Sequence, residues 1–191
     1  DRSPSRGLGD VYKRQPMDRK EEPVRVAVDS NLFISLFLDE DENLNDRTEA
    51  VLGYDGFDVV LSTLVGIEGV GAVGMRKGAS IGPIDNEEIQ AARRFFDNAD
   101  VLWMEVNRKV MLRARDYSTQ FVIKPPDATV LACAVESGCE YLFTNDDGLI
   151  KHSDSIPGIE ICPPPPLTFF PGEEKGFVLP DQPGGEAELP D

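Results

Sequence analysis

The sequence has little of the chemistry that thiol-based or histidine-based sites require. Its 191 residues include three cysteines and a single histidine. The cysteines, Cys133, Cys139 and Cys162, are odd in number and have no CxxC spacing, which argues against a disulfide framework or a zinc site. We therefore expect them to be buried, reduced thiols of a cytoplasmic protein.

Long apolar runs are also missing. No stretch approaches the roughly 18–20 apolar residues that a transmembrane helix needs, and no secretory signal with an apolar core is present. The chain length and the hydrophobic content of 40% instead suit one soluble globular domain with an ordinary core.

Positive charge is scarce as well. The chain has 19 Lys and Arg residues against 35 Asp and Glu residues, and its net charge is −16. The overall field therefore repels nucleic acid, which argues against tight, non-specific DNA binding. A nucleic acid would have to be held by a local basic patch together with metal ions, and the candidates for phosphate contacts are Arg76, Lys77, Arg108 and Arg113, with Lys109 and Arg115 nearby.

The composition divides the chain into three parts. Residues 1–22 form a non-native or disordered leader, because residues 2–15 resemble translated sequencing-adaptor sequence and Met17 is the expected natural start. Residues 23–162 form the folded domain. Residues 163–191 are rich in Pro, Gly and Glu and are expected to be a disordered acidic tail, whose apolar island at residues 167–170 could alternatively dock on the domain or on a partner.

Strand and helix patterns alternate through residues 23–162. Apolar runs followed by capping residues and amphipathic stretches are typical of βαβ units, so we expect the α/β class with a mostly parallel sheet of four to five strands. Residues 39–45 are interpreted as a solvated loop. The predicted strands are 24–28, 58–64, 101–106, 141–144 and an edge strand at 159–162; the predicted helices are 30–38, 47–52 capped by Asp46, a glycine-rich helix to about residue 77, 87–98, a helix capped by Asn107, and 127–137.

Acidic residues mark several of the predicted strand ends. Asp29 closes the first strand, Glu68 follows the second, and Asp146 closes the fourth, while Asp127 opens the preceding helix. Ligands of open parallel sheets bind outside the carboxyl ends of the strands, where these four side chains should meet. Carboxylates so close raise each other's pKa unless a cation neutralises them, so the pattern predicts a divalent-metal site and suggests phosphodiester hydrolysis.

Each of these residues also has a plainer interpretation. Asp29 or Ser30 could cap the first helix, and Asp127 could complement a helix dipole. A rival signal is the GxGxxG pattern of residues 69–74, which matches a dinucleotide-binding fingerprint. That fingerprint belongs in the first turn after a strand, so we favour close helix packing or a dimer contact for these glycines.

Four short motifs, taken in order, resemble those of the PIN-domain nucleases. The first is Val26-Ala27-Val28-Asp29-Ser30-Asn31-Leu32-Phe33, and the second is Glu68 after a strand that ends in Ser/Thr. The third is Pro126-Asp127-Ala128 followed by Leu131-Ala132 and Ala134, and the fourth is Leu142-Phe143-Thr144-Asn145-Asp146. The likeness covers about residues 24–162.

The resemblance implies a three-layer α/β/α fold that binds Mg²⁺ or Mn²⁺ and cuts RNA. It implies an endoribonuclease of the toxin type, with a possible antitoxin protein as partner and a homodimeric assembly. The alternatives are a catalytically idle PIN-like domain that binds RNA or protein, and a housekeeping RNA-processing nuclease. The implied catalytic and metal-binding residues are Asp29, Glu68, Asp127 and Asp146, with Asn31, Thr144 and Asp147 orienting them.

Overall fold

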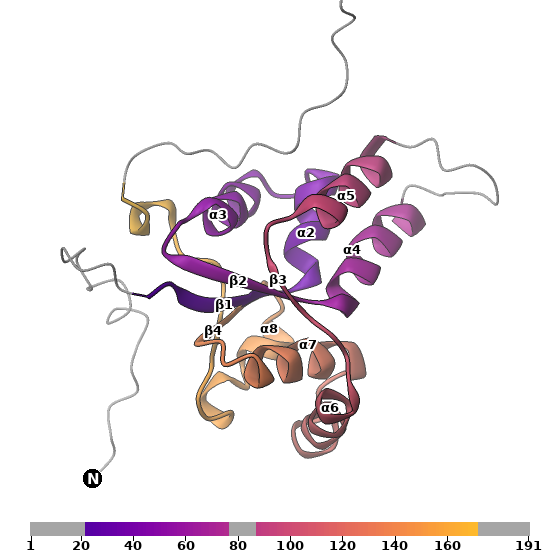
Figure 1. Cartoon of the computed structure of the whole chain (residues 1–191), viewed down its shortest axis with the longest axis vertical. Coiled ribbons are helices and arrows are strands. Elements are labelled where there is room, and N and C mark those ends of the chain that lie inside the picture. The colour runs from indigo at the N-terminus through magenta and orange to yellow at the C-terminus, as the bar shows by residue number, and fades with distance from the viewer. Residues whose placement is uncertain (1–21, 77–86, 172–191) are drawn as a thin grey trace, which may run out of the picture.

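The computed structural model describes residues 22–76 and 87–171 (Figure 1). The predicted leader up to residue 21, Lys77, and the predicted tail beyond residue 171 lie outside these ranges.

A single parallel sheet organises the described chain. Its strands lie in the order β3-β2-β1-β4-β5, and every neighbouring pair is parallel. The edge position predicted for the last strand is confirmed. The strands are β1 (Val24–Val28), β2 (Phe57–Ser62), β3 (Leu102–Met104), β4 (Tyr141–Phe143) and β5 (Glu160–Cys162).

Helices cover both faces of the sheet, so the predicted three-layer α/β/α architecture is confirmed. In Figure 1, α2, α3, α4 and α5 lie on one side of the strands, and α6, α7 and α8 lie on the other. The helices are α2 (Ser30–Leu38), α3 (Glu42–Gly53), α4 (Thr63–Arg76), α5 (Glu87–Asn98), α6 (Arg108–Phe121), α7 (Pro125–Glu136) and α8 (Asp147–Ile150), with short 3-10 turns η1 (Ser153–Ser155) and η2 (Leu167–Phe169).

The central strands are apolar because they are buried on both faces, as expected of a parallel sheet. Val26 and Val28 of β1, Leu61 of β2 and Leu142 of β4 are all almost completely buried. On the α2 side, an aromatic cluster joins α2 to α5, with Phe33 and Phe37 packed on Phe95 and Phe96.

Several predicted boundaries differ from the observed ones, and hydrogen bonds explain two of the differences. The helix predicted from residue 47 begins at Glu42, because Asp41 caps it by accepting a hydrogen bond from the backbone N–H of Leu44 at 3.0 Å. The second strand ends at Ser62 rather than residue 64, because the Ser62 hydroxyl accepts from the backbone N–H of Leu64 at 3.2 Å and α4 begins at Thr63.

The chain continues in ordered form past the predicted end of the domain. The η2 turn places Phe169 and Phe170 against Tyr54 and Phe57, so the apolar island docks on the domain. The three cysteines are buried and unpaired. Among the described helices, none has the length and apolar character needed to cross a bilayer.

Candidate active site

Asp29 lies at the carboxyl end of β1 and is almost completely buried, with 5% of its surface exposed. Its Oδ1 accepts from the backbone N–H of Ser30 at 2.7 Å, so it caps α2. Its Oδ2 accepts from the Thr144 hydroxyl at 2.7 Å. Both carboxylate oxygens are therefore held by neutral donors, and the charge itself has no ion-pair partner among the described residues.

Thr144 fixes the orientation of this carboxylate. It follows β4 and is fully buried. Its Oγ1 donates to Asp29 and accepts from Asn31 Nδ2 at 2.9 Å and from the backbone N–H of Asp146 at 3.1 Å. Asn31 thus orients Thr144 rather than Asp29 directly. One hydroxyl connects the ends of β1 and β4 and leaves the threonine proton no other acceptor than Asp29.

Glu68 reaches the site from a helix rather than from a strand end. It lies in the second turn of α4, past the end of β2. Ser30 Oγ donates to Glu68 Oε2 at 2.9 Å, which links α4 to the start of α2. The sequence interpretation saw in Ser30 only a helix cap.

Asp127 and Asp146 come from the other side of the sheet. Asp127 lies in the first turn of α7, which starts at Pro125 and Pro126. Asp146 caps the short helix α8, where its Oδ1 accepts from the backbone N–H of Gly148 at 2.7 Å. The neighbouring Asp147 is exposed, and the predicted orienting role of its side chain remains a prediction.

Electrostatic interactions link the four carboxylates in a chain, from Glu68 to Asp29, from Asp29 to Asp127, and from Asp127 to Asp146. Burial raises the pKa of Asp29 from 3.8 to about 6; the hydrogen bonds from Thr144 and Ser30 lower it, and the charges of Asp127 and Glu68 raise it further. Burial also raises the pKa of Asp127, while Lys124 lowers it and Asp146 raises it. The site therefore concentrates negative charge at the carboxyl edge of the sheet.

The donor chemistry of this edge suits a hard divalent cation. All four side chains are carboxylates, the oxygen ligands that Mg²⁺ prefers. None of them makes an ion pair with Lys or Arg in the part of the chain that the structure describes. Over those same residues, no three Asp, Glu, His or Cys side chains close around one point in a metal-binding arrangement. The four side chains therefore match a divalent-metal site in ligand type and in charge.

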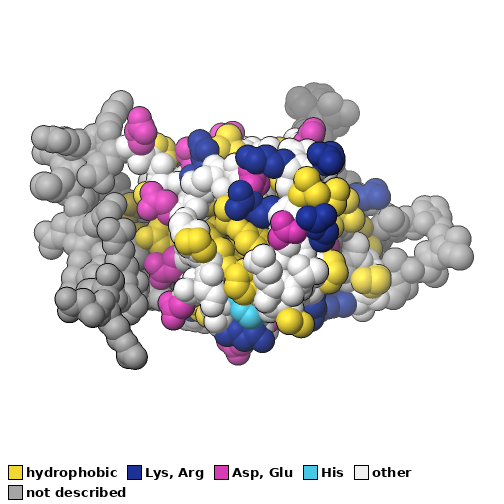
Figure 2. Space-filling view, turned by 90° about the horizontal axis from the view of Figure 1, so that it is seen from below, with side chains coloured by type: hydrophobic (Ala, Val, Ile, Leu, Met, Phe, Trp, Pro, Cys, Tyr) yellow, Lys and Arg dark blue, Asp and Glu magenta, His cyan; other side chains and the backbone are white. Residues whose placement is uncertain are grey.

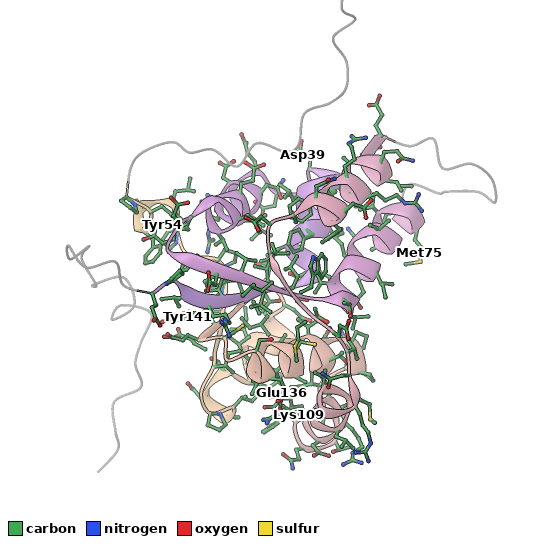
Figure 3. All side chains as sticks on the ribbon, in the orientation of Figure 1. Asp39, Tyr54, Met75, Lys109, Glu136 and Tyr141 are labelled. Carbon is green, nitrogen blue, oxygen red and sulfur yellow. The ribbon has the colours of Figure 1, made fainter. Side chains whose placement is uncertain are left out.

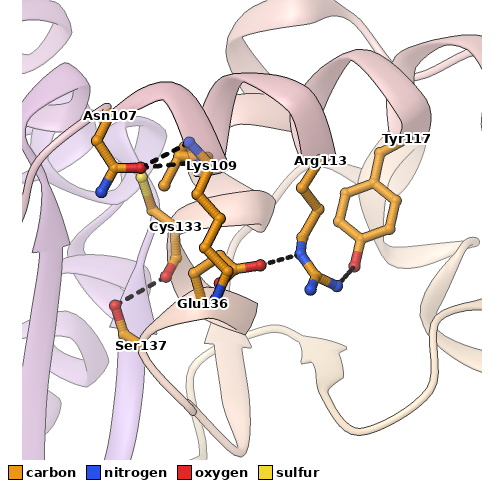
Figure 4. A network of polar contacts seen from close by, with 8 residues as sticks. Asn107, Lys109, Arg113, Tyr117, Cys133, Glu136 and Ser137 are labelled. Carbon is orange, nitrogen blue, oxygen red and sulfur yellow. Dashed lines mark hydrogen bonds and ion pairs between the residues drawn. The ribbon is translucent and has the colours of Figure 1, made fainter.

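The predicted phosphate-binding residues lie elsewhere and are mostly engaged. Arg76 pairs with Glu40. Arg113 and Lys109 both form ion pairs with Glu136. Arg113 also donates a hydrogen bond to the Tyr117 hydroxyl at 3.4 Å (Figure 4). Figure 2 shows Lys and Arg side chains gathered on one half of the face formed by α6 and α7. Arg108, at the start of α6, is exposed.

Glu136 lies at the opposite end of α7 from Asp127. Since a helix rises about 1.5 Å per residue, nine residues separate these side chains by roughly 14 Å along the helix axis. The basic residues that surround Glu136 are therefore set apart from the four carboxylates within one chain.

The chain matches the model of a known protein family. A family model described as PIN domain matches residues 26–154. None of the curated proteins matches the sequence.

The solved structures that share the fold include the following three. VapC20 from Mycobacterium tuberculosis, described as a sarcin-ricin loop cleaving toxin, is 16% identical with a TM-score of 0.52, over 64% of this chain and 90% of that one. A toxin–antitoxin complex from Klebsiella pneumoniae is 20% identical with a TM-score of 0.52, over 74% and 99%. VapBC2 from Rickettsia felis, bound to a DNA fragment from its promoter, is 14% identical with a TM-score of 0.50, over 72% and 97%.

Proposed function

Since this chain belongs to the PIN domain family, we propose that it is a divalent-metal-dependent endoribonuclease, the toxin of a toxin–antitoxin pair. The observation that supports the proposal is a set of four carboxylates on four separate elements, connected by the electrostatic interactions of Asp29 with Glu68 and Asp127 and of Asp127 with Asp146. A buried Asp29 without a basic partner costs stability. Natural proteins retain such groups where function needs them.

Asp29, Glu68, Asp127 and Asp146 would hold Mg²⁺ or Mn²⁺. When bound, the cation lowers the pKa of a water molecule and offsets the charge of the phosphodiester. Hydrogen bonds within the chain orient the Asp29 carboxylate. Thr144 donates to Asp29, and Asn31 donates to Thr144. No histidine or cysteine nucleophile is required for this chemistry.

RNA and an antitoxin are the proposed substrate and partner. VapC20 is described as cleaving the sarcin-ricin loop, and the Klebsiella structure is described as a toxin–antitoxin complex. Arg76, Lys77, Arg108 and Arg113 remain the candidates for contacts with RNA phosphates. Because Arg76 and Arg113 already have acidic partners, Arg108 is the candidate among the described residues that makes no ion pair.

We also propose a homodimer, because α4, β3 and α6 expose several large apolar side chains. Figure 3 shows Met75 pointing outward from α4. The exposed apolar side chains of these elements, and of the segment between β3 and α6, are Ile67, Met75, Leu102, Trp103, Val106 and Met111. Trp103 is 42% exposed and lines a groove of about 310 Å³ between α4, α5 and β3. Sedimentation of the wild type against Ile67→Asp tests this assembly.

The decisive test is cleavage of RNA by the purified chain, with Mg²⁺ or Mn²⁺ against EDTA. Asp29→Asn and Asp146→Asn should each abolish cleavage while the far-UV circular dichroism spectrum stays unchanged. Asp100→Asn is the matched control, since Asp100 is an exposed acid outside the site, and it should cleave like the wild type. Cleavage that survives both site variants would refute the assignment.

One observation favours the alternative of an idle binding domain: the carboxylates do not close around a single point among the described residues. RNA binding without any metal-dependent cleavage would identify that case. Cleavage without an antitoxin gene beside this one would favour a housekeeping RNA-processing nuclease.

A further inference from the structure

Ser30 contacts two of the four carboxylates through different atoms. Its backbone N–H donates to Asp29 Oδ1 at 2.7 Å, and its hydroxyl donates to Glu68 Oε2 at 2.9 Å. The residue is almost buried, between the end of β1 and the helix α4. It therefore bridges a carboxylate from the sheet and a carboxylate from a helix.

The hydroxyl proton of Ser30 belongs to Glu68 rather than to Asp29. A serine hydroxyl has one proton to donate. Its oxygen lies 2.9 Å from Glu68 Oε2 but 3.5 Å from Asp29 Oδ1, which is at the limit of a hydrogen bond. Asp29 already has the Ser30 backbone N–H and the Thr144 hydroxyl as donors.

Glu68 needs such a donor in order to face Asp29. Like charges repel, and the charge of Glu68 raises the pKa of Asp29. Glu68 is half-exposed and has a long, flexible side chain, so solvent offers it an easy alternative. The bond from Ser30 is the one side-chain hydrogen bond that Glu68 makes within residues 22–76 and 87–171.

We propose that Ser30 is a positioning residue that keeps Glu68 directed at Asp29, so that a divalent cation finds both carboxylates together. The inference rests on the proposed function, since it assumes that these carboxylates bind a metal. Without the hydroxyl, binding of the cation would first have to draw Glu68 in from solvent. The predicted consequence is a weaker affinity for the cation.

The experiment measures Mn²⁺ affinity of the full chain by titration calorimetry. Loss of a residue that orients a metal ligand typically costs about 10- to 100-fold in affinity, so Ser30→Ala should weaken Mn²⁺ binding by at least roughly 10-fold. Ser30→Thr keeps the hydroxyl and should restore the wild-type affinity. Ser30→Cys, of similar size but a weak donor, gives the same comparison should the alanine variant not fold.

Ser35→Ala is the matched control on the same helix. Ser35 is buried and donates to Asn45 Oδ1 at 2.8 Å, away from the carboxylates. Its loss should lower the thermal midpoint as Ser30→Ala does, yet leave the Mn²⁺ affinity unchanged. Equal weakening of Mn²⁺ binding in both variants would show that Ser30 acts through general stability, and would overturn the proposal.

A double-mutant cycle with Glu68→Gln identifies the route. If Ser30 acts by directing Glu68, Ser30→Ala should have no further effect on Mn²⁺ affinity in the Glu68→Gln background. An undiminished effect there overturns the inference. A wild type that binds no Mn²⁺ overturns the proposed function and this inference with it. A wild type and Ser30→Ala that bind Mn²⁺ equally well overturn the inference alone.

Discussion

Asp29 is the residue on which the site depends, and its surroundings oppose its charge. It is buried, it accepts hydrogen bonds only from neutral groups, and its nearest charged neighbours at the site are acidic. A cation at the carboxylates would offset the free-energy cost of ionising Asp29. In the metal-free protein, this cost should lower the stability of the fold.

We predict that the metal-free protein loses stability between pH 4 and pH 7 because of Asp29. The folded-state pKa, about 6, is above the usual 3.8. A raised pKa gives stability that is complete below the unfolded-state value and is lost as the pH rises through the folded-state value. At 1.36 kcal/mol per pKa unit, the loss is on the order of 2 to 3 kcal/mol.

Urea denaturation in EDTA, at several pH values, checks this prediction. The stability of the wild type minus that of Asp29→Asn should fall across this interval, whereas Asp100→Asn should follow the wild type. Adding Mn²⁺ at pH 7 should recover stability in the wild type but not in Asp29→Asn. A difference curve that is flat or rises with pH would contradict the assignment.

The sequence was informative about single residues where a motif fixed the backbone around them. Asp29 and Thr144 follow apolar strands, and their contact follows from the parallel pairing of β1 with β4. The bond from Ser30 to Glu68 could not be predicted, because it depends on how α4 packs on α2. That packing is set by side chains distant in sequence, not by local pattern.

At the scale of elements, α4 contains glycines that lower its helix propensity, and only some of them have a packing reason. A Cβ on Gly69 would lie 2.6 Å from Phe96 Cε2, so this glycine admits the aromatic cluster. A Cβ on Gly71 would meet nothing within 4 Å. The GxGxxG pattern lies inside α4 and not in the first turn after β2; close packing explains Gly69, but no neighbouring atom explains Gly71.

The two glycines should therefore respond oppositely to alanine. Gly69→Ala forces a ring of the core to move and should destabilise by about 1 to 2 kcal/mol, the overpacking cost less the helix gain. Gly71→Ala gains helix propensity without a clash and should stabilise by up to about 1 kcal/mol. Thermal denaturation of the pair checks the prediction, and equal shifts in one direction would refute the packing argument.

Two ion pairs connect α6 to α7, from Lys109 and Arg113 to Glu136, and together they are called the charged clamp. The Glu136 side chain is 3% exposed because Lys109 and Arg113 cover it, while those two are 75% and 41% exposed. Figure 3 shows Glu136 and Lys109 meeting between the two helices. Hydrogen bonds from Lys109 and then Arg113 hold the pKa of Glu136 below its usual range.

Glu136→Gln should destabilise the protein by about 1 kcal/mol, a modest value because both cations reach solvent. Here the stability is present above the unfolded-state pKa and is lost as the pH falls, the opposite sign to Asp29. The effect should shrink in 1 M NaCl. Asp116→Asn, which breaks the exposed pair with Arg115, should change the midpoint little. A Glu136→Gln effect no larger than this control would exclude the clamp.

The start of α3 shows the limit of sequence reasoning for elements. Asp39, Glu40, Asp41 and Glu42 resemble a solvated run, and Asp46 resembles a cap. The structure uses Asp41 as the cap, and it buries Ser35, Asn45 and Thr48 in a polar seam between α2 and α3. Several residues of the run were able to cap a helix, and only tertiary packing selects among them.

For the whole molecule, the alternation of strands and helices was enough to predict a mostly parallel sheet, and the family resemblance added the three-layer arrangement. Neither was enough to find where the chain stops packing. Pro163–Pro166 resemble the end of a domain, yet Pro164 and Pro165 are buried and Arg47 Nε donates to the Pro165 carbonyl at 3.2 Å. Contacts with residues distant in sequence determine whether this segment packs on the domain, so the local sequence pattern could not predict it.

The docking of η2 on Tyr54 and Phe57 should contribute measurably to stability. Phe170 packs on Tyr54 with ring centroids 5.4 Å apart, and Phe169 stacks on Phe57 at 6.0 Å. Because both phenylalanines are half-buried, the double change Phe169→Ala with Phe170→Ala should destabilise by roughly 2 to 4 kcal/mol, less than two fully buried rings would cost. Leu167→Ala, at an exposed position of the same turn, should cost under about 0.5 kcal/mol. Urea denaturation measures all three chains. If the double variant and Leu167→Ala unfold at the same urea concentration, the segment after β5 contributes nothing to the fold; if only the double variant shifts, the folded domain extends through Phe170.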